Sequence, residues 1–264
     1  MRFDDYKTLS FQRHDRILEV TMNVPEKLNA VGQQMHAELA RVFIDIAGDA
    51  ESDVIILTGA GRAFSAGGDI EFMEAILHSP AAFEVIAREG KQIITAMLEC
   101  EKPIIAKVNG NATGLGATIA LFCDVIFAAD SARIGDPHVL VGLVAGDGGA
   151  AIWPQLVGFA RAKEFLMTGE LLTAQRAAEI GLVNHTVAAE DLDAAVAAFA
   201  RRLAQGATKA IRWTKMSVNV ALKPIVHAVM DASLAFEGLS SRTPDHAEAV
   251  QAFKEKRRPQ FHRQ

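Results

Sequence analysis

The sequence contains little cysteine and no long apolar run, and both shortages exclude classes of protein. Only Cys100 and Cys123 occur among 264 residues, without CxxC spacing, so we expect neither a disulfide framework nor a cysteine-ligated zinc site. The most apolar stretch, residues 117–129, is interrupted by Asp124 and is too short to cross a bilayer. Because residues 1–10 also lack the apolar centre of a signal peptide, we expect a cytoplasmic protein with no membrane partner.

An excess of basic charge is also absent. The formal net charge is −5, and the basic residues are spread out except for a run at residues 254–258, so we expect no nucleic-acid partner. Hydrophobic residues make up 50% of the chain, which is enough to bury a large core. We expect one α/β core at residues 1–200, followed by a helical region at residues 201–264.

Two glycine-rich turns of similar design organise the middle of the chain. Residues 59–70 and residues 110–119 each follow a β-rich run, and each turn opens a stretch of helical character. Neither turn has the lysine and hydroxyl residue of a phosphate loop, and Ile119 stands where a dinucleotide fingerprint needs its third glycine, which disfavours ATP and nicotinamide sites. Either turn alone could be a plain connection. As a pair they could present unpaired backbone N–H groups to one oxygen atom, the geometry of an oxyanion hole.

Hydrophobic patterning predicts strands and helices in alternation, followed by helices alone. Strands are expected at residues 16–22, 53–58, 104–108, 124–128 and 182–187. Helices are expected at residues 32–48, 81–98, 148–157, 159–167, 173–180 and 189–204. Three further helical runs are expected after residue 207, separated near Pro224 and Pro244 because proline interrupts a helix.

Six segments, taken in order, resemble one known family. They are PEKLNA at 25–30, GRAFSAGGDI at 61–70, KPIIAKVNG at 102–110, Cys123-Asp124, GLV at 181–183 and FKEKRRP at 253–259. This pattern resembles the enoyl-CoA hydratase/isomerase family of the crotonase superfamily. The resemblance implies a crotonase-like spiral of repeated β-β-α units with a helical C-terminal trimerisation region. It also implies an acyl-CoA substrate, no cofactor beyond the coenzyme A of that substrate, no metal, and a homotrimer or dimer of trimers.

The resemblance also assigns the site residue by residue. It implies that the N–H groups of Ala66 and Leu115 form the oxyanion hole, which would stabilise a thioester enolate. It places the coenzyme A along Lys27, Leu28, Ala30, Ala63, Phe64, Gly67, Gly68, Asp69, Ile70 and Gly114. It further implies that Phe253 and Lys256 of a neighbouring subunit help to hold the nucleotide.

The chain departs from this pattern at the two glutamates with which the family's hydratases activate water. The matching positions are Thr118 and His138, which argues against hydration by the two-glutamate route. The carboxylate left for chemistry is Asp147, which could transfer a proton with help from His138 or could cap the helix expected at 148, and these two roles are compatible. Asp147 also matches the nucleophile of the related chlorobenzoyl-CoA dehalogenases, but residues 81–98 lack the histidine that dehalogenation needs.

We therefore expect an acyl-CoA enzyme of hydratase/isomerase type, with a 1,3-proton shift or a modified hydration as its reaction. Two alternatives remain open at this point. One is a catalytically silent acyl-CoA-binding protein, and the other is a hydrolase or decarboxylase of the same superfamily.

Overall fold

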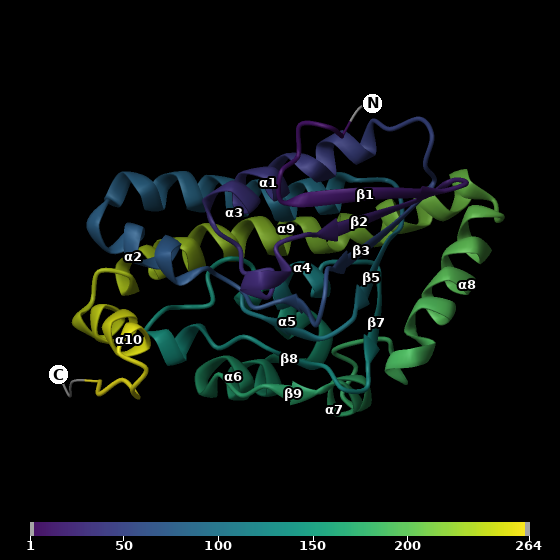
Figure 1. Cartoon of the computed structure of the whole chain (residues 1–264). Coiled ribbons are helices and arrows are strands. Elements are labelled where there is room, and N and C mark those ends of the chain that lie inside the picture. The colour runs from purple at the N-terminus through teal and green to yellow at the C-terminus, as the bar shows by residue number, and fades with distance from the viewer. Residues whose placement is uncertain (1–2, 262–264) are drawn as a thin grey trace.

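The computed structural model describes residues 3–261, apart from the side chains of residues 75, 76, 78 and 80, and it contains two β-sheets (Figure 1). The larger sheet has six strands in the order β1-β2-β3-β5-β7-β10, antiparallel between β1 and β2 and parallel elsewhere. The smaller sheet has four strands in the order β4-β6-β8-β9. The strands are β1 Leu9–His14, β2 Ile17–Met22, β3 Val54–Gly59, β4 Ala63–Ser65, β5 Ile104–Val108, β6 Asn111–Thr113, β7 Val125–Ala129, β8 Arg133–Gly135, β9 Leu172–Thr173 and β10 His185–Val187.

Three consecutive strand pairs give the fold its repeat. Each pair, β3 with β4, β5 with β6, and β7 with β8, contributes one strand to the large sheet and the next strand to the small sheet. Helices follow each pair along the chain, α2 and α3 after the first, α4 after the second and α5 after the third, the last preceded by the short η2. The predicted class, an α/β spiral of repeated β-β-α units with a helical C-terminal region, is confirmed.

The helices follow the predicted ranges closely up to residue 204. They are η1 Pro25–Lys27, α1 Gln33–Ala47, α2 Ile70–His78, α3 Pro80–Glu99, α4 Leu115–Leu121, η2 His138–Val141, α5 Gly149–Val157, α6 Phe159–Thr168, α7 Ala174–Glu179, η3 Ala189–Asp191, α8 Leu192–Ala204, α9 Thr208–Ser240 and α10 Pro244–Lys254. The expected break at Pro224 is wrong, because α9 continues through it. Val226 and Met230, which follow the proline, are fully buried, and this packing offsets the lost backbone hydrogen bond.

The C-terminal helices cover the core and then turn back toward the site. Helix α9 packs against α3 and α5, and α10 packs against α2 and η2 (Figure 1). Lys254 on α10 forms an ion pair of 2.8 Å with Glu74 on α2. Among residues 3–261, none of the helices combines the length and apolar character needed to cross a bilayer.

Candidate active site

The two glycine-rich turns lie directly against each other. Gly67 has a φ of +83°, and a methyl group added there would lie 2.7 Å from the carbonyl oxygen of Thr113. A methyl group added at Gly116 would lie 2.6 Å from Cβ of Ser65. Side chains at these two glycines would therefore force the turns apart, and glycine lets the end of β4 approach the start of α4.

The hydrogen bonds made by residues 66–68 show which N–H group of the first turn remains unpaired. The N–H of Ala66 donates to the carbonyl oxygen of Leu28 at 3.0 Å, so it is already engaged in holding the turn. The predicted role of Ala66 as an oxyanion-hole donor is therefore wrong. Gly67 uses its N–H as well, in a 3.3 Å bond to the Ser65 hydroxyl. The N–H of Gly68, by contrast, has no hydrogen-bond partner among residues 3–261.

The second turn supplies a free donor as predicted. Leu115 is the first residue of α4, where a helix has no carbonyl to pair with its N–H, and no partner for it occurs in the described part of the chain. Gly114, the residue before it, lies close to the first turn, because a methyl group added there would be 3.7 Å from Cα of Gly67. Gly68 and Leu115 thus present two unpaired N–H groups from adjacent turns.

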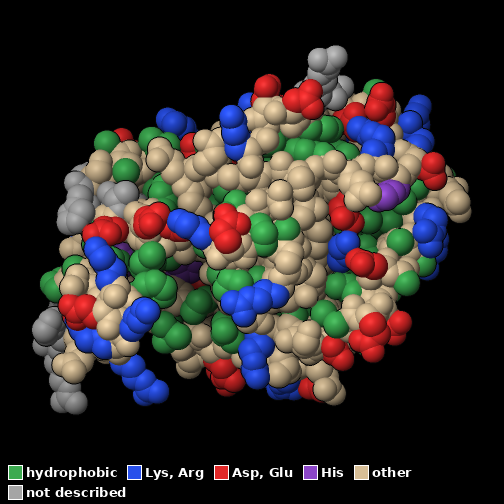
Figure 2. All heavy atoms as spheres, viewed as in Figure 1, with side chains coloured by type: hydrophobic (Ala, Val, Ile, Leu, Met, Phe, Trp, Pro, Cys, Tyr) green, Lys and Arg blue, Asp and Glu red, His purple; other side chains and the backbone are tan. Residues whose placement is uncertain are grey.

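A cavity of about 590 Å³ opens beside these donors. Most of the residues predicted to contact the substrate line it: Lys27, Leu28, Ala30, Ala66, Gly67, Gly68, Asp69, Ile70, Gly114 and His138. Figure 2 shows hydrophobic side chains around a hollow on this face, with acidic and basic side chains along its rim. Ala63 and Phe64 do not line the cavity, because both side chains are buried in β4. Their predicted contact with the nucleotide is not supported, and they belong to the core.

The C-terminal residues also differ from expectation. Phe253 lines the cavity of its own chain, although the resemblance implied that it reaches a neighbouring subunit. The cause is the turn after α9, which brings α10 back over α2 and η2. Lys256, beyond the end of α10, is not among the residues that line this cavity.

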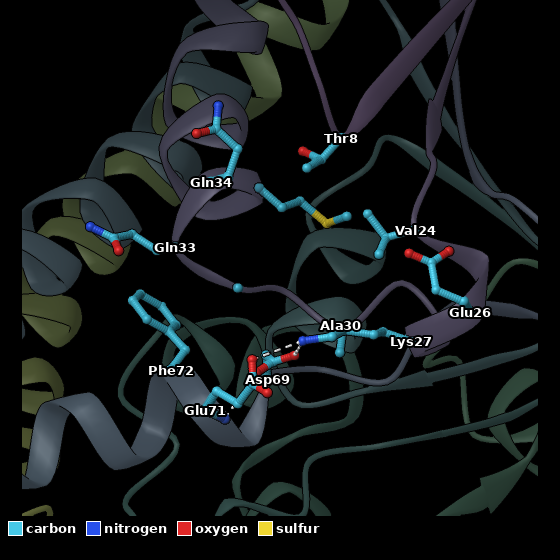
Figure 3. A pocket seen from close by; sticks show the side chains of 12 residues that line it. Thr8, Val24, Glu26, Lys27, Ala30, Gln33, Gln34, Asp69, Glu71 and Phe72 are labelled. Carbon is cyan, nitrogen blue, oxygen red and sulfur yellow. Dashed lines mark hydrogen bonds and ion pairs between the residues drawn. The ribbon is translucent and has the colours of Figure 1, made fainter.

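Lys27 forms a charged rim between this cavity and a neighbouring one of about 390 Å³ (Figure 3). Its ammonium group lies 3.0 Å from Asp69 and 3.0 Å from Glu71. The hydrogen bond to Asp69, followed by that to Glu71, raises the pKa of Lys27. The cation along which the resemblance places the coenzyme A is therefore shared by two carboxylates.

Asp147, Thr118 and His138 meet at one point beside the cavity. The Thr118 hydroxyl donates to Oδ1 of Asp147 at 3.1 Å, and Nε2 of His138 lies 3.5 Å from Oδ2 of the same carboxylate. The other ring nitrogen of His138 hydrogen-bonds to Asp136. The side chains of His138 and Asp147 expose only 11% and 13% of their surface, so water reaches them poorly. His138 is thus flanked by two carboxylates, and Asp147 is held from two sides.

Burial and mutual charge set the protonation of this group. Burial lowers the pKa of His138, but Asp136 and Asp147 outweigh it and hold that pKa well above its ordinary value. Burial raises the pKa of Asp147, while the charge of His138 and the hydrogen bond from Thr118 oppose the rise. The pair therefore consists of an imidazolium beside a carboxylate that accepts a proton more readily than an exposed one.

The alternative role of Asp147 as a helix cap also has support. The N-cap position of α5 is Gly148, which has no side chain to cap the helix, and the Asp147 carboxylate accepts from the N–H of Gly149. Capping and proton transfer are thus compatible. Asp136, His138 and Asp147 have donor atoms within 4.8 Å of one another, a spacing that a cation could bridge. Both ring nitrogens of His138 already face carboxylates, however, which leaves neither nitrogen free to bind a cation.

One acid beside these residues, Glu237 on α9, is not among those predicted from the sequence. Burial raises its pKa to about 8, and its Oε2 atom is buried without a hydrogen-bond partner in the described structure. The charge of His138 opposes this rise, which places Glu237 in the electrostatic field of the same cluster. A signal was present in the sequence, because Glu237 follows the buried residues Met230, Ser233 and Leu234 at helical spacing. The spacing places the acid on the same helix face as these residues, but only the packing of α9 against α5 shows that this face is covered.

Comparison with known proteins identifies the family. Residues 12–264 match the family described as enoyl-CoA hydratase/isomerase. The chain is 33% identical over 257 residues to a probable enoyl-CoA hydratase from Mycobacterium bovis, covering 97% of this chain and 98% of that protein. An enoyl-CoA hydratase/isomerase structure from Mycobacterium paratuberculosis has a TM-score of 0.90 and 35% identity over 94% of this chain and 99% of that one.

A further solved neighbour has a different stated activity. It is a beta-diketone hydrolase from the cyanobacterium Anabaena, bound to (S)-3-oxocyclohexyl acetic acid, with a TM-score of 0.85 and 33% identity. The match covers 91% of this chain and 96% of that one. Family match, curated relative and solved structures agree over nearly the full length of the sequence. The chain belongs to the enoyl-CoA hydratase/isomerase family.

Proposed function

We propose that the protein is an acyl-CoA-processing enzyme of enoyl-CoA hydratase/isomerase type, and that Asp147 is its principal proton-transfer group. The observation that carries this proposal is the position of Asp147 between Thr118, on the helix that Leu115 opens, and His138, whose ring lies beside Gly114. In this proposal the donors at Gly68 and Leu115 stabilise the oxygen of a thioester enolate. Asp147 then removes a proton from one carbon of the acyl chain and returns it to another.

A 1,3-proton shift fits this site better than hydration by two glutamates. Thr118 has no useful pKa for acid–base work, and His138 is held as a cation by its neighbours, so neither replaces a general base. One carboxylate is enough for isomerisation, since the same group can take and give back the proton. The imidazolium of His138 lowers the pKa of Asp147 and so keeps part of it ionised despite burial.

The reaction is tested by the mass of the product. Purified protein is incubated with a 3-enoyl-CoA and, separately, with a 2-enoyl-CoA, and the products are separated and weighed by mass spectrometry. Isomerisation leaves the mass unchanged and moves the double bond, whereas hydration adds one water. Accumulation of a hydrated product alone would overturn the proton-shift assignment but keep the acyl-CoA class.

Hydrolysis of a 1,3-dicarbonyl compound is a second candidate, and the position of His138 between Asp136 and Asp147 favours it. Asp147 would take a proton from water while the water oxygen bonds to the β-carbonyl carbon. The bond between the α- and β-carbons would then break, its electron pair would form the enolate held by the N–H groups, and His138 would protonate the α-carbon. The Anabaena neighbour is a beta-diketone hydrolase, which supports this candidate. Turnover of a 3-oxoacyl-CoA to two acyl fragments, with no turnover of enoyl-CoA, would select it.

A catalytically silent role is not favoured. Burying Asp147 and Glu237 around His138 costs stability, because burial raises the pKa of both acids, and a protein without chemistry to perform gains nothing from that cost.

The assembly is also part of the proposal. Helix α9 carries large apolar side chains that are exposed in the single chain, namely Trp213, Val218, Val220, Phe236 and Leu239. Covering them between copies of this chain in closed symmetry supports a homotrimer or a dimer of trimers. Cys100 and Cys123 are both buried and unpaired, which supports a reducing, cytoplasmic location.

A further inference from the structure

The segment that carries His138 and Asp147 is tethered to the C-terminal helices at three points. The Ser233 hydroxyl on α9 donates to the carbonyl oxygen of Gly146 at 3.0 Å. The N–H of Val144 donates to the Ser240 hydroxyl at 3.1 Å. On α10, Nδ1 of His246 lies 2.6 Å from the carbonyl oxygen of Val141. A helical region outside the repeats therefore holds the backbone of residues 138–147.

Of the three contacts, the one from His246 reaches the residue nearest to His138 in the sequence, Val141. The ring of His246 is fully buried, and because a carbonyl oxygen only accepts, Nδ1 must carry the proton. Burial lowers the pKa of His246, so the neutral ring with Nδ1–H is the stable form near neutral pH. Its other nitrogen, Nε2, is buried without a hydrogen-bond partner among the described residues. The hydrogen bond to Val141 is thus the one polar interaction of this ring in that part of the chain.

The backbone around this contact has no room to shift. Gly142 has a φ of +68°, and a methyl group added there would lie 2.8 Å from the backbone nitrogen of His246. His138 and Val141 are the first and last residues of the single turn η2, and the N–H of Leu143 donates back to the carbonyl of His138 at 2.9 Å. A displacement at Val141 is therefore passed through one short turn to His138.

We propose that His246, together with Ser240, is a positioning residue that holds η2 so that the His138 ring stays within reach of Asp147. This inference rests on the proposed function, in which His138 and Asp147 act together. The separation of 3.5 Å between their side chains is easily lengthened, and a misplacement on the order of 1 Å can cost about a hundredfold in rate. The groups that set the charge of His138 are Asp136, Asp147 and Glu237, and His246 adds no charge to them while neutral.

The test compares His246→Leu with His246→Asn. Asparagine can place its amide nitrogen where Nδ1 lies and keep the donor, whereas leucine fills similar space without one. Gln251→Leu is the matched control, because it removes a side chain that hydrogen-bonds only at the exposed surface of the same helix. Each variant is measured for kcat, for KM, and for the ring resonances of His138 by proton–nitrogen correlation NMR, assigned with His138→Gln.

We expect His246→Leu to lower kcat by roughly ten- to a hundredfold with little change in KM, and to move the His138 resonances. His246→Asn should restore most of kcat and the wild-type resonances, and Gln251→Leu should match the wild type. Wild-type kcat and resonances in His246→Leu, or equal losses in both His246 variants, would overturn the proposal.

The proposal can also be decided if His246→Leu does not fold or if the wild type turns over no acyl-CoA. If His246→Leu does not fold, Ser240→Ala decides, since it removes the tether at Val144 and should shift the same resonances and lower kcat. Unchanged resonances and kcat in Ser240→Ala would then overturn the proposal. If the wild type turns over no acyl-CoA, the proposed function fails, while the resonances of His138 still decide whether His246 and Ser240 position it.

Discussion

The hydroxyl of Thr118 donates a 3.1 Å hydrogen bond to the carboxylate of Asp147, although the two residues belong to different repeats. Thr118 lies on α4 at the position where the resemblance implies a glutamate, and Asp147 comes from the loop before α5. The carboxyl group is thus supplied by the following repeat, and the residue in the glutamate position serves as its hydrogen-bond donor. An acid is thus held against the helix that begins at Leu115.

Replacing Asp147 with Asn should abolish most of the turnover while leaving substrate binding intact. The amide keeps the size of the side chain and can still accept from Thr118, but it cannot take up a proton. We expect kcat to fall by roughly a hundredfold or more, the usual scale for general acid–base catalysis, with an unchanged dissociation constant for an acyl-CoA. Steady-state kinetics and calorimetry measure the two quantities. Full activity in this variant would reduce Asp147 to a cap of α5.

Replacing Glu237 with Gln should stabilise the protein at alkaline pH. The pKa of Glu237 is raised to about 8 in the folded chain, so its contribution to folding is fully present below its unfolded pKa and is lost as pH rises through about 8. Glutamine is neutral at every pH and escapes this loss. The melting temperature of the variant should therefore equal that of the wild type near pH 4 and exceed it by several degrees above about pH 8.

The control for this prediction is Glu179→Gln, which changes an exposed acid that pairs with Arg176. Its melting temperature should follow the wild type across the whole pH range, because exposed ion pairs contribute little. If the melting temperatures of Glu237→Gln and the wild type are equal at every pH, Glu237 ionises in the folded protein without a loss of stability, and the prediction is contradicted.

Coenzyme A thioesters should raise the melting temperature, whereas NAD and ATP should not. A ligand that binds only the folded state adds RT ln(1 + [L]/Kd) to stability. Lys27→Met should weaken the shift, because the cavity rim then keeps Asp69 and Glu71 without their cation. A matching shift with ATP, or none with several thioesters, would contradict the assignment of the cavity.

Long strands and helices, in which the hydrophobic pattern repeats several times, were predictable from the sequence. The short elements were not. The predicted range 53–58 is β3 with a shift of one residue, since four consecutive branched or leucine side chains mark a buried parallel strand. Strands β4, β6 and β8 have three residues each, too few to show alternation. These strands pair with one another in the small sheet because the chain of each repeat bends after its first strand. The family resemblance implied this bend, and local patterning did not.

In the candidate site, too, features set by the local sequence were predictable and features set by contacts between distant residues were not. The resemblance implied Leu115 as a donor, and the position of this residue at the start of a helix leaves its N–H unpaired. The choice between Ala66 and Gly68 depends on the carbonyl of Leu28, which is remote in sequence and takes the Ala66 N–H. Glu237 was missed for a related reason, because its burial depends on how α9 packs over the loop before α5.

The assembly prediction follows from the exposed apolar residues of α9. If they lie between subunits, light scattering should report three or six copies of the chain at working concentrations. Trp213→Glu should weaken that assembly, since it places a charge among Val220 and the other apolar side chains of this helix. Lys209→Glu, on the first turn of the same helix, is the control for charge alone. A wild-type monomer would contradict the prediction without affecting Phe253, which reaches the cavity of its own chain.

The oxyanion donor proposed at Leu115 can be removed by a single substitution, although it is a backbone group. Leu115 occupies the first position of α4, where proline is tolerated because its missing N–H would be unpaired by the helix in any case. Leu115→Pro should therefore preserve α4 while deleting the donor, and turnover should fall on the order of 10²–10³-fold, as in comparable oxyanion holes. Leu115→Ala is the control, because it trims the same buried side chain but keeps the N–H. Circular dichroism and thermal melts show whether both variants fold, and kcat for an acyl-CoA gives the comparison. Similar turnover in the two variants would mean that Leu115 does not contact the enolate oxygen, and would leave Gly68 as the donor to examine.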